Sequence, residues 1–455
     1  MFLLLLALIQ SSLGSHSYFQ GLELLSDVNY TQGFSVIPAC FVNPDACAKG
    51  PQFRLYNPFS TAPNASASWQ MAQWDSHSNI STNGTFVHDG KSEGMQWLSE
   101  DKRFILFEDS RLQISVNGYH EYQGKYRTPD EPWVALLIQQ SIGKSAGSVS
   151  LNQVTELRWN LDIQLLYMDQ HIQPGYNPNI HAGQFPLYMT IQNLSPGDPD
   201  YGKYFWLGIC LYDDRFPMSP LYVNGDKGTG ALIYQPAFSN FANVSVQNGS
   251  IVHVTGNMMP FVRLGLEAAV ERGFLNSTDL SKYYVGGMNI GWEVTGLNNG
   301  TIEIGNFSLK QYTAQNPKSY EFNQDGDTEG WKLAFNSNKS GSNPSNGKWI
   351  LSLPNEYSYV SSPEVMIDTS VVKKVIIRTN YNMLQLHWTR NHKELFNKND
   401  RFRSELENDG KCKEHILDLS NHPHWYGIVR RFRIDSVRQD NITDFIIDYI
   451  RFSPS

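Results

Sequence analysis

Short segments rich in aromatic and β-branched residues recur along most of this chain, and they constrain its fold more than any other feature. Glycine, proline, asparagine and aspartate separate them, as expected of strands joined by turns. In the N-terminal two-thirds these segments are residues 114–116, 133–139, 161–166, 185–192, 204–212, 231–234 and 302–309. Many short strands with turn signals predict a β-sandwich or jelly roll.

One stretch departs from this strand pattern. Between residues 258 and 274, Val262, Leu266 and Ala269 recur at helical spacing. This spacing predicts a helix that packs against the sandwich. Residues 278–284 predict a short second helix.

A polar, proline-containing stretch at residues 312–319 divides the chain. Beyond it, apolar and polar residues alternate in residues 371–378, 384–389, 414–419, 430–434 and 445–452. Such alternation is typical of antiparallel strands with one buried face. We therefore predict a mostly β protein of two antiparallel β-sandwich, jelly-roll-like domains. The larger covers residues 16–313 and has one or two short helices, and the smaller covers residues 318–455.

Residues 1–15 have the layout of a secretory signal peptide. Their apolar stretch is shorter than the roughly 20 residues needed to cross a bilayer, and small residues follow it. No later stretch is apolar enough for a membrane helix. We therefore expect a secreted, extracellular protein without membrane insertion.

Twelve Asn-X-Ser/Thr triplets agree with a secretory route. Behind a signal peptide these triplets are acceptors for N-linked sugar. The acceptor residues are Asn29, Asn64, Asn79, Asn83, Asn193, Asn243, Asn248, Asn276, Asn299, Asn306, Asn338 and Asn441. We expect a glycoprotein in which some of these sites stay unused.

The chain has four cysteines. Cys40 and Cys47 lie in one polar loop, and an oxidising compartment favours a local disulfide between them. Cys210 lies in an apolar run and Cys412 in a charged loop, and a bond between these two is left open. No spacing typical of a metal site occurs among the cysteines.

The formal charge of −8 argues against a nucleic-acid partner, which would call for basic patches. The sequence also lacks the motifs of serine esterases, nucleoside triphosphatases, zinc proteases and dinucleotide-dependent enzymes. Aromatic residues make up 13% of the chain. Aromatic side chains with polar tips stack on sugars, and they also fill sandwich cores.

The smaller domain carries a series of motifs in a characteristic order. They are Phe-Asn-Gln-Asp-Gly-Asp-Thr-Glu-Gly-Trp at residues 322–331, Leu-His-Trp-Thr at 386–389, Leu-Asp-Leu-Ser at 417–420 and Ile-Asp-Tyr-Ile at 447–450. This domain resembles the galactose-binding-like, carbohydrate-binding β-sandwich modules of secreted bacterial glycan-processing proteins. The resemblance implies a saccharide ligand or a role in joining domains.

The same resemblance implies a bound calcium ion. Asp325, Asp327 and Asp448 would supply the hard oxygen ligands that calcium takes. Trp388, Trp425 and Tyr426 are the candidates for stacking on a sugar. Trp425 and Tyr426 lie in a proline-containing loop and are the better exposed candidates, whereas Trp388 has the alternative of a core position.

The larger domain resembles secreted bacterial β-sandwich proteins of unassigned function. The motifs that carry this likeness are Trp-Gln-Met-Ala-Gln-Trp at residues 69–74, His-Ala-Gly-Gln at 181–184, Tyr-Asp-Asp-Arg at 212–215 and Gly-Gly-Met-Asn-Ile-Gly-Trp-Glu at 286–293. The resemblance supplies no catalytic residues.

Candidate catalytic groups in the larger domain follow from residue type instead. Asp213, Asp214 and Arg215 end an apolar strand, where a sheet fixes side chains and loops admit a ligand. Successive strand residues point to opposite faces, so the two aspartates cannot act on one bond without a bulge. The alternative is a turn in which an aspartate pairs with Arg215.

Glu121, His181 and Glu293 complete the set. Histidine and carboxylates serve as general acids and bases, and a glycosidase needs two carboxylates at a defined separation. Glu293 would pair with Glu121 or Asp213. The alternative for each is a structural polar residue at a strand end.

We expect a protein that binds extracellular carbohydrate. The alternatives are a polysaccharide lyase or glycoside hydrolase acting through the larger domain, and a structural component of an extracellular or skeletal matrix. The partners expected are extracellular glycans or matrix.

Overall fold

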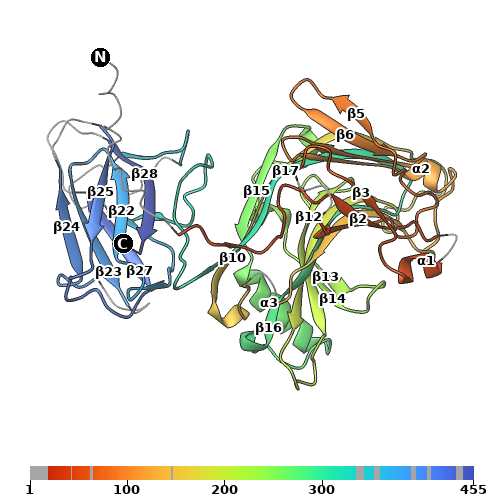
Figure 1. The fold of residues 1–455 in the computed structure, drawn as a ribbon. Helices are drawn as coiled ribbons and strands as arrows, with labels where there is room; N and C mark the ends of the chain where they lie inside the picture. The colour runs from red at the N-terminus through yellow and green to blue at the C-terminus, as the bar shows by residue number, and fades with distance from the viewer. Residues whose placement is uncertain are drawn as a thin grey trace, which may run out of the picture. The chain divides into compact units, whose positions relative to one another are not determined.

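A computed structural model describes residues 19–41, 44–61, 65–144, 147–334, 343–352, 359–390, 396–406, 411–436 and 444–454. The chain divides into two compact units, which are described separately (Figure 1). The larger unit is Leu22–Gln311, and the smaller contains the described residues from Tyr312 onward together with residues 19–21. The predicted signal peptide, residues 1–15, lies outside the described residues.

The larger unit is built from two sheets. The first has the strand order β15 (Val252–Asn257), β10 (Val154–Gln170), β17 (Asn298–Thr313), β8 (Leu112–Asn117), β7 (Lys102–Phe107), β6 (Glu93–Leu98) and β5 (Thr85–His88), and β1 (Leu22–Glu23) pairs with β17. The second has the order β13 (Tyr222–Gly225), β14 (Leu232–Gln235), β12 (Tyr204–Asp213), β11 (Gly183–Asn193), β16 (Tyr283–Val294), β9 (Val134–Ser141), β4 (Trp69–Ala72), β2 (Phe34–Ile37) and β3 (Phe53–Leu55).

Alternating side chains of the second sheet fill the core between the sheets. Leu187, Met189 and Ile191 of β11 are fully buried there. Trp292 of β16 is also fully buried, and its indole N–H donates to the carbonyl of Ile114 in β8 at 2.8 Å, linking the two sheets. Because neighbours along a strand point to opposite faces, the residues between these core positions line the outer face of the nine-stranded sheet.

The predicted long helix is confirmed as α3 (Met259–Glu271), and its Val262 and Leu266 enter the core. The second predicted helix, over residues 278–284, is wrong. Only a 3-10 turn forms there, Leu280–Lys282, capped by the Asp279 side chain. The apolar residues after it continue directly into β16.

The remaining helical elements are short. They are α1 (Pro44–Ala48), α2 (Gly118–Glu121) and the 3-10 turns Leu151–Gln153, Phe238–Asn240 and Val246–Asn248. Among the described residues, no helix has the length and apolar character to span a membrane.

The smaller unit also contains two main sheets. One has the order β18 (Lys332–Ala334), β20 (Tyr359–Ser361), β27 (Arg431–Ser436), β23 (Met383–Thr389) and β24 (Arg401–Glu405). The other has the order β19 (Trp349–Ser352), β28 (Asp444–Ser453), β22 (Lys374–Thr379) and β25 (Lys413–Asp418), and β21 (Ile367–Asp368) pairs with β26 (Ile428–Val429). A separate apolar core fills this unit.

The prediction of mostly β domains built largely from antiparallel strands is confirmed. Two strand pairs of the larger unit differ from the expectation, because β2 pairs with β4 and β12 with β14 in parallel. Phe19 packs against the core of the smaller unit, although the sequence placed it in the larger domain.

Candidate functional site

A row of polar residues crosses the outer face of the nine-stranded sheet. Strand register sets them side by side from β3 to β12, in the order Arg54, Ser35, Gln70, Gln139, Asn289, Tyr188 and Gly208. The alternation that buries apolar residues in the core also places amides and hydroxyls here. We call these seven residues the amide row.

The amide row contains an unsatisfied acceptor. Gln139 donates to Gln70 at 3.1 Å, and the Tyr188 hydroxyl donates to Gln235 at 2.7 Å. Asn289 lies between them and is 8% exposed, and its Oδ1 accepts no hydrogen bond within the described residues. Buried polar atoms are almost always paired, so this atom calls for a ligand or water.

An aromatic cluster continues the amide row towards β12. The ring centroid of Trp206 lies 6.3 Å from that of Tyr188 and 5.3 Å from that of Tyr204. All three rings are only half-buried. The Trp206 indole N–H is fixed by Thr229 at 3.1 Å. Half-buried, oriented rings beside amides offer both an apolar surface and hydrogen bonds to a ligand.

Glu293 lies in a parallel row on the same face. Register aligns Ala135 of β9, Glu293 of β16, Gln184 of β11 and Asp213 of β12. Burial raises the pKa of Glu293 to about 7, and the nearby charge of Asp226 adds to this, while a hydrogen bond from Trp133 opposes it. A carboxyl group with this pKa can hold or give a proton near neutral pH.

Asp213 forms hydrogen bonds and an ion pair with residues other than Glu293. Arg215 binds it through Nε at 2.8 Å and Nη2 at 2.6 Å, and Gln184 donates to it at 2.6 Å. The side chain is almost fully buried. The structure therefore shows the ion-paired turn, and Asp213 positions Gln184 beside Glu293.

Asp214 faces away from this row. It accepts hydrogen bonds from the Gly183 amide at 3.0 Å, Asn298 at 2.6 Å and Gln170 at 2.7 Å. Burial raises its pKa to about 6, against the effect of these donors. Gln170 and Asn298 belong to the first sheet, so Asp214 ties the two sheets together.

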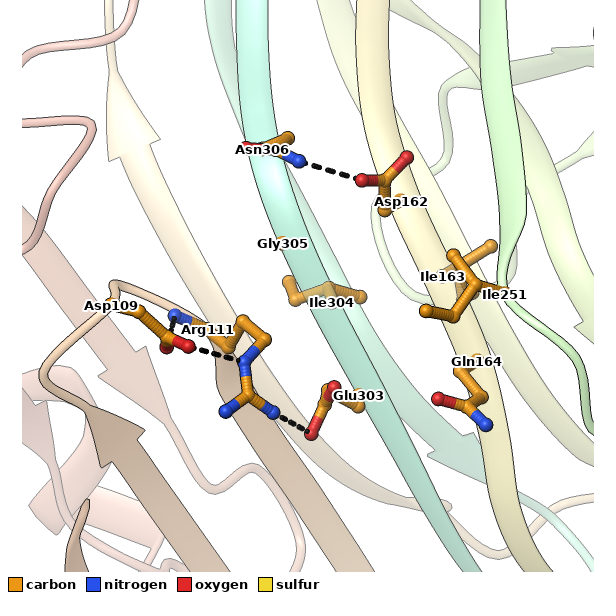
Figure 2. Close-up of a pocket in the computed structure, with 10 residues that line it drawn as sticks. All are labelled: Asp109, Arg111, Asp162, Ile163, Gln164, Ile251, Glu303, Ile304, Gly305 and Asn306. Atoms are coloured by element: carbon orange, nitrogen blue, oxygen red, sulfur yellow. Dashed lines mark hydrogen bonds and ion pairs between the residues drawn. The ribbon is translucent and has the colours of Figure 1, made fainter. Parts of the chain in front are cut away.

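An open pocket of about 280 Å³ lies instead on the first sheet (Figure 2). Arg111 lines it and binds Asp109 and Glu303, each at 2.8 Å, and Asp89 at 2.7 Å. Asn306, a predicted glycosylation acceptor, also lines the pocket and donates to Asp162. These charged groups are thus held by partners within the larger unit.

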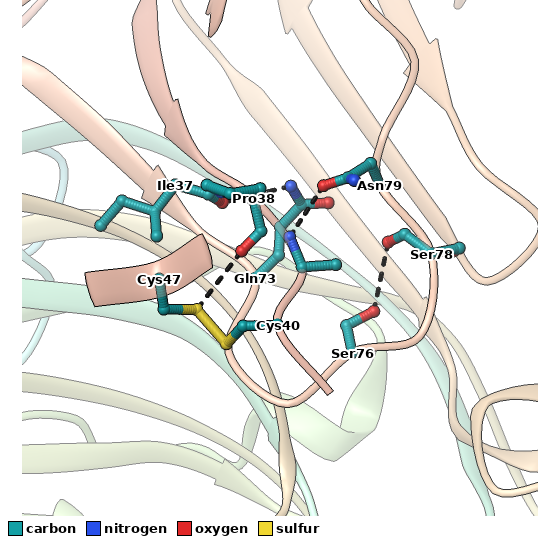
Figure 3. The surroundings of a disulfide bond; sticks show 9 residues. Ile37, Pro38, Cys40, Cys47, Gln73, Ser76, Ser78 and Asn79 are labelled. Atoms are coloured by element: carbon teal, nitrogen blue, oxygen red, sulfur yellow. Dashed lines mark hydrogen bonds between the residues drawn. A yellow bond between two sulfur atoms is a disulfide. The ribbon is translucent and has the colours of Figure 1, made fainter. Parts of the chain in front are cut away.

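Glu121 is structural. It is almost fully buried, accepts from the Lys102 ammonium at 3.0 Å and from the backbone amide of His77 at 2.9 Å, and contacts the Ser76 hydroxyl. Burial lowers the pKa of Lys102. These contacts hold the loop of Ser76 and His77, and Figure 3 shows Ser76 near the disulfide.

That disulfide is the predicted one. Cys40 and Cys47 are bonded, with their Cα atoms 5.7 Å apart. Asn79, which Figure 3 labels near the disulfide, accepts a hydrogen bond from the Ala39 amide at 2.7 Å. Cys210, which is buried in the larger unit, and Cys412, in the smaller unit, are free thiols in the structure.

His181 is structural too. The ring is 2% exposed and stacks on Tyr126, with centroids 4.3 Å apart. Its Nδ1 accepts from the Asn177 amide at 2.9 Å, and its Nε2 lies 3.0 Å from the Arg127 carbonyl. Both nitrogens are engaged. Within the described residues, neither His181 nor Glu121 bonds to Glu293.

Two of the three predicted stacking residues in the smaller unit lie in its core. Trp388 is fully buried, and Trp425 is 7% exposed with its indole N–H donated to the Val372 carbonyl at 2.9 Å. Trp425 was expected to be exposed because it lies in a loop. This expectation was wrong, because the ring points into the core. Tyr426 is exposed, with the Arg390 guanidinium 4.2 Å from its ring centroid.

The aspartates assigned to calcium do not form a site. Asp325 accepts from the Asn346 amide, Asp327 from the Glu329 amide, and Asp448 pairs with Arg378 at 3.3 Å. Among the described residues, no group of three metal-ligating side chains is assembled. These residues do not fit the ion that the resemblance implied.

The predicted glycosylation acceptors differ in accessibility. Those at exposed positions are Asn29, Asn79, Asn83, Asn243, Asn248, Asn276 and Asn306, while Asn299 is half-buried and Asn64, Asn338 and Asn441 lie outside the described residues. Asn193 is fully buried, and its amide donates to Asp198 at 2.9 Å. A glycan on Asn193 would not fit this packing.

Comparisons with known proteins identify no family. No family model matches the chain, and no curated protein matches it. Solved structures with a similar arrangement include endoglucanase Cel12A from Rhodothermus marinus, at 11% identity and a TM-score of 0.29, covering 51% of this chain and 98% of that one. Another is a family 12 xyloglucanase from Bacillus licheniformis, at 13% identity and a TM-score of 0.29. The match covers 50% of this chain and 96% of that one.

A third is a low-affinity xylan-binding module from Roseburia intestinalis, at 16% identity and a TM-score of 0.22, covering 30% of this chain and 96% of that one. At such low TM-scores, none of these likenesses identifies the function of this chain. What the structure defines is a protein of two β-sandwich units with a polar, aromatic-flanked sheet face.

Most residues of that face were not singled out from the sequence. Gln70, Gln139, Asn289 and Tyr188 lie on separate strands, and only the pairing of the strands aligns them. The available signal was the alternation within each strand, which marks these residues as outward-facing once their neighbours are assigned to the core.

Proposed function

We propose that this chain is a secreted protein that binds extracellular carbohydrate through the outer face of the nine-stranded sheet. The observation that carries the proposal is the amide row beside the aromatic cluster, with the Asn289 acceptor left unpaired. Sugar rings present an apolar face to aromatic side chains and hydroxyl groups to amides. Apart from Arg54 at its β3 end, the amide row has uncharged hydrogen-bonding groups, which suit a neutral glycan better than a charged one.

The proposal is tested by binding the full chain to a panel of neutral polysaccharides, measured by calorimetry or affinity electrophoresis. Trp206→Ala removes the central ring of the aromatic cluster and should weaken binding at least about fivefold, because aromatic contacts contribute roughly 1 kcal/mol beyond the buried area. Tyr167→Ala is the control, since Tyr167 is 53% exposed on β10 of the other sheet. Absence of binding to every glycan, or equal losses in both variants, would contradict the proposal.

The raised pKa of Glu293 favours glycoside hydrolysis as a second candidate. A protonated carboxyl can donate to the oxygen of the leaving group while a second carboxylate activates water or attacks. Asp226 is the nearby acid, because its charge acts on Glu293, whereas Asp213 is held by Arg215. The sequence did not single out Asp226, which lies in the loop after β13.

An assay for reducing ends released from a bound polysaccharide distinguishes hydrolysis from binding alone. Hydrolysis predicts that Glu293→Gln abolishes release but keeps binding. Asp226→Asn should abolish release as well, because it removes the second carboxylate that hydrolysis needs. Binding without release would leave a carbohydrate-binding or matrix protein.

A further inference from the structure

The outer face of the five-stranded sheet in the smaller unit carries a concentration of cationic side chains. Phe432 and Ile434 of β27 enter the core, so the residues that alternate with them point outward. The cationic residues of this face are Lys332 in β18, Arg431 and Arg433 in β27, and Arg401 and Arg403 in β24. The acidic residues there are Asp435 and Glu405, so positive charge prevails on this face of a chain whose net charge is −8.

Strand register places three of these cations in one row. From β18 to β24 the aligned residues are Lys332, Ser361, Arg433, His387 and Arg401. Neighbouring strands lie roughly 4.8 Å apart, so the three cations follow one another at intervals of roughly 10 Å. A row of evenly spaced cations matches a polymer with regularly repeated anionic groups better than a single small anion.

Most of these charges are not neutralised within the unit. Arg433 binds Asp435 at 2.8 Å and lies over the Tyr359 ring. Arg401 and Arg403 are exposed and contact the uncharged side chains of Gln385 and Met383. Among the described residues, no carboxylate pairs with Arg401, Arg403 or Lys332.

A buried histidine in the middle of the row has one ring nitrogen without a partner. His387 is 8% exposed, and its Nε2 pairs with Asp435 Oδ2 at 3.4 Å. Its Nδ1 makes no hydrogen bond within the described residues. A buried, unpaired ring nitrogen between Arg433 and Arg401 is a second indication that the face accepts a polar ligand.

We propose that this face binds an anionic polysaccharide whose sulfate or carboxylate groups engage Lys332, Arg401, Arg403 and Arg433. Guanidinium groups bind such anions through paired hydrogen bonds. The proposal concerns a different unit and a different ligand charge from the neutral-glycan face. Two aromatic rings beside these cations, Tyr359 and Phe396, already have a guanidinium group over them, that of Arg433 and that of Arg431, and so are not free to stack on nucleic-acid bases.

The test is retention of the full chain on heparin, which carries sulfates, and on polygalacturonate, which carries only carboxylates, with dextran as the neutral polymer. We expect binding to at least one anionic polymer, none to dextran through this face, and weakening as salt is added. The double variant Arg401→Glu and Arg403→Glu should lose at least about tenfold in affinity, because like charges then face each other. Heparin alone as the binder would identify sulfate as the recognised group.

The matched control is Lys91→Glu with Arg263→Glu, two exposed cations of the larger unit. It changes the net charge equally and should leave binding unchanged. Because all four residues are exposed, thermal unfolding should show that both double variants fold. Equal losses in both variants, no binding to either anionic polymer, or binding only to phosphatidylserine vesicles would overturn the proposal. The Arg401 and Arg403 variant should still bind a neutral polysaccharide. Such binding would show that the neutral-glycan face acts independently of the cationic face.

Discussion

At the scale of single residues, Glu293 has the chemistry most unlike that of an ordinary surface acid. It lies on an outer sheet face, yet burial beside Trp133 and the charge of Asp226 favour its protonated form. A carboxyl group with a raised pKa can act as a general acid when a substrate reaches it. Its ionisation also destabilises the folded protein, and this effect on stability can be measured without knowing any ligand.

Glu293→Gln should stabilise the protein at high pH but not at low pH. The folded pKa of about 7 lies above the ordinary value of 4.5, so ionisation costs free energy only in the folded state. Below about pH 4.5 Glu293 therefore does not lower the free energy of unfolding. As the pH rises through 7, this free energy falls because of Glu293. We expect the variant to gain on the order of 2 kcal/mol at pH 8 and nothing at pH 4. Chemical denaturation at the two pH values checks this, and an equal change at both would contradict it.

Burial predicts which glycosylation acceptors stay unused. Asn193 is fully enclosed and bonded to Asp198, whereas Asn243 and Asn248 are exposed. In protein secreted from a eukaryotic host, peptide mass spectrometry should find Asn193 unmodified and at least one of the exposed pair modified. A glycan on Asn193 in correctly folded protein would show that the β11 end is packed differently.

The sequence identified individual chemical groups better than their surroundings. It singled out Glu293 by residue type, but the partner Asp226 lies in a distant loop that only the fold brings near. It placed Trp425 in an exposed loop, yet the ring packs inward because its indole N–H finds the Val372 carbonyl. Residue type and local polarity do not determine the direction of a side chain in a loop.

At the scale of elements, β16 shows why some strands escape detection. Its residues Gly286, Gly287 and Gly291 lower its strand propensity. Gly291 has φ 151°, and a Cβ there would lie 2.2 Å from the Leu136 carbonyl oxygen. Glycine is thus required by the close approach of β9, a contact that strand periodicity does not reveal. The parallel pairs β2–β4 and β12–β14 were missed for the same reason, since pairing is non-local.

Gly265→Ala in α3 should destabilise the protein even though alanine favours helix. Alanine gains about 1 kcal/mol in helix propensity over glycine. A Cβ at Gly265 would lie 2.3 Å from the ring of Phe205, which is fully buried and cannot move aside freely. Overpacking costs about 1–3 kcal/mol, so we expect a net loss near 1 kcal/mol by chemical denaturation.

Glu267→Ala, at an exposed position of the same helix, is the matched control. It should change stability by less than about 0.5 kcal/mol. A stabilised Gly265→Ala variant would mean that α3 is free to move away from β12.

At the scale of the whole molecule, two units with separate cores present two chemically different sheet faces. The larger unit offers uncharged amides and partly exposed rings, and the smaller offers a row of cations. Alternating side chains built both faces, because each strand that fills a core must display its other residues outward. The overall class was predictable from that alternation, whereas the composition of each face depended on strand order.

The most direct test of the account is to map where a bound neutral polysaccharide protects the full chain from hydroxyl-radical oxidation. We predict protection of Trp206, Tyr204 and Tyr188 on the nine-stranded sheet, with Tyr167 on the opposite sheet and Tyr426 in the smaller unit unchanged. Protection confined to Tyr426, to Tyr167 or to the pocket beside Arg111, with the aromatic cluster oxidised as in the free protein, would contradict the central claim.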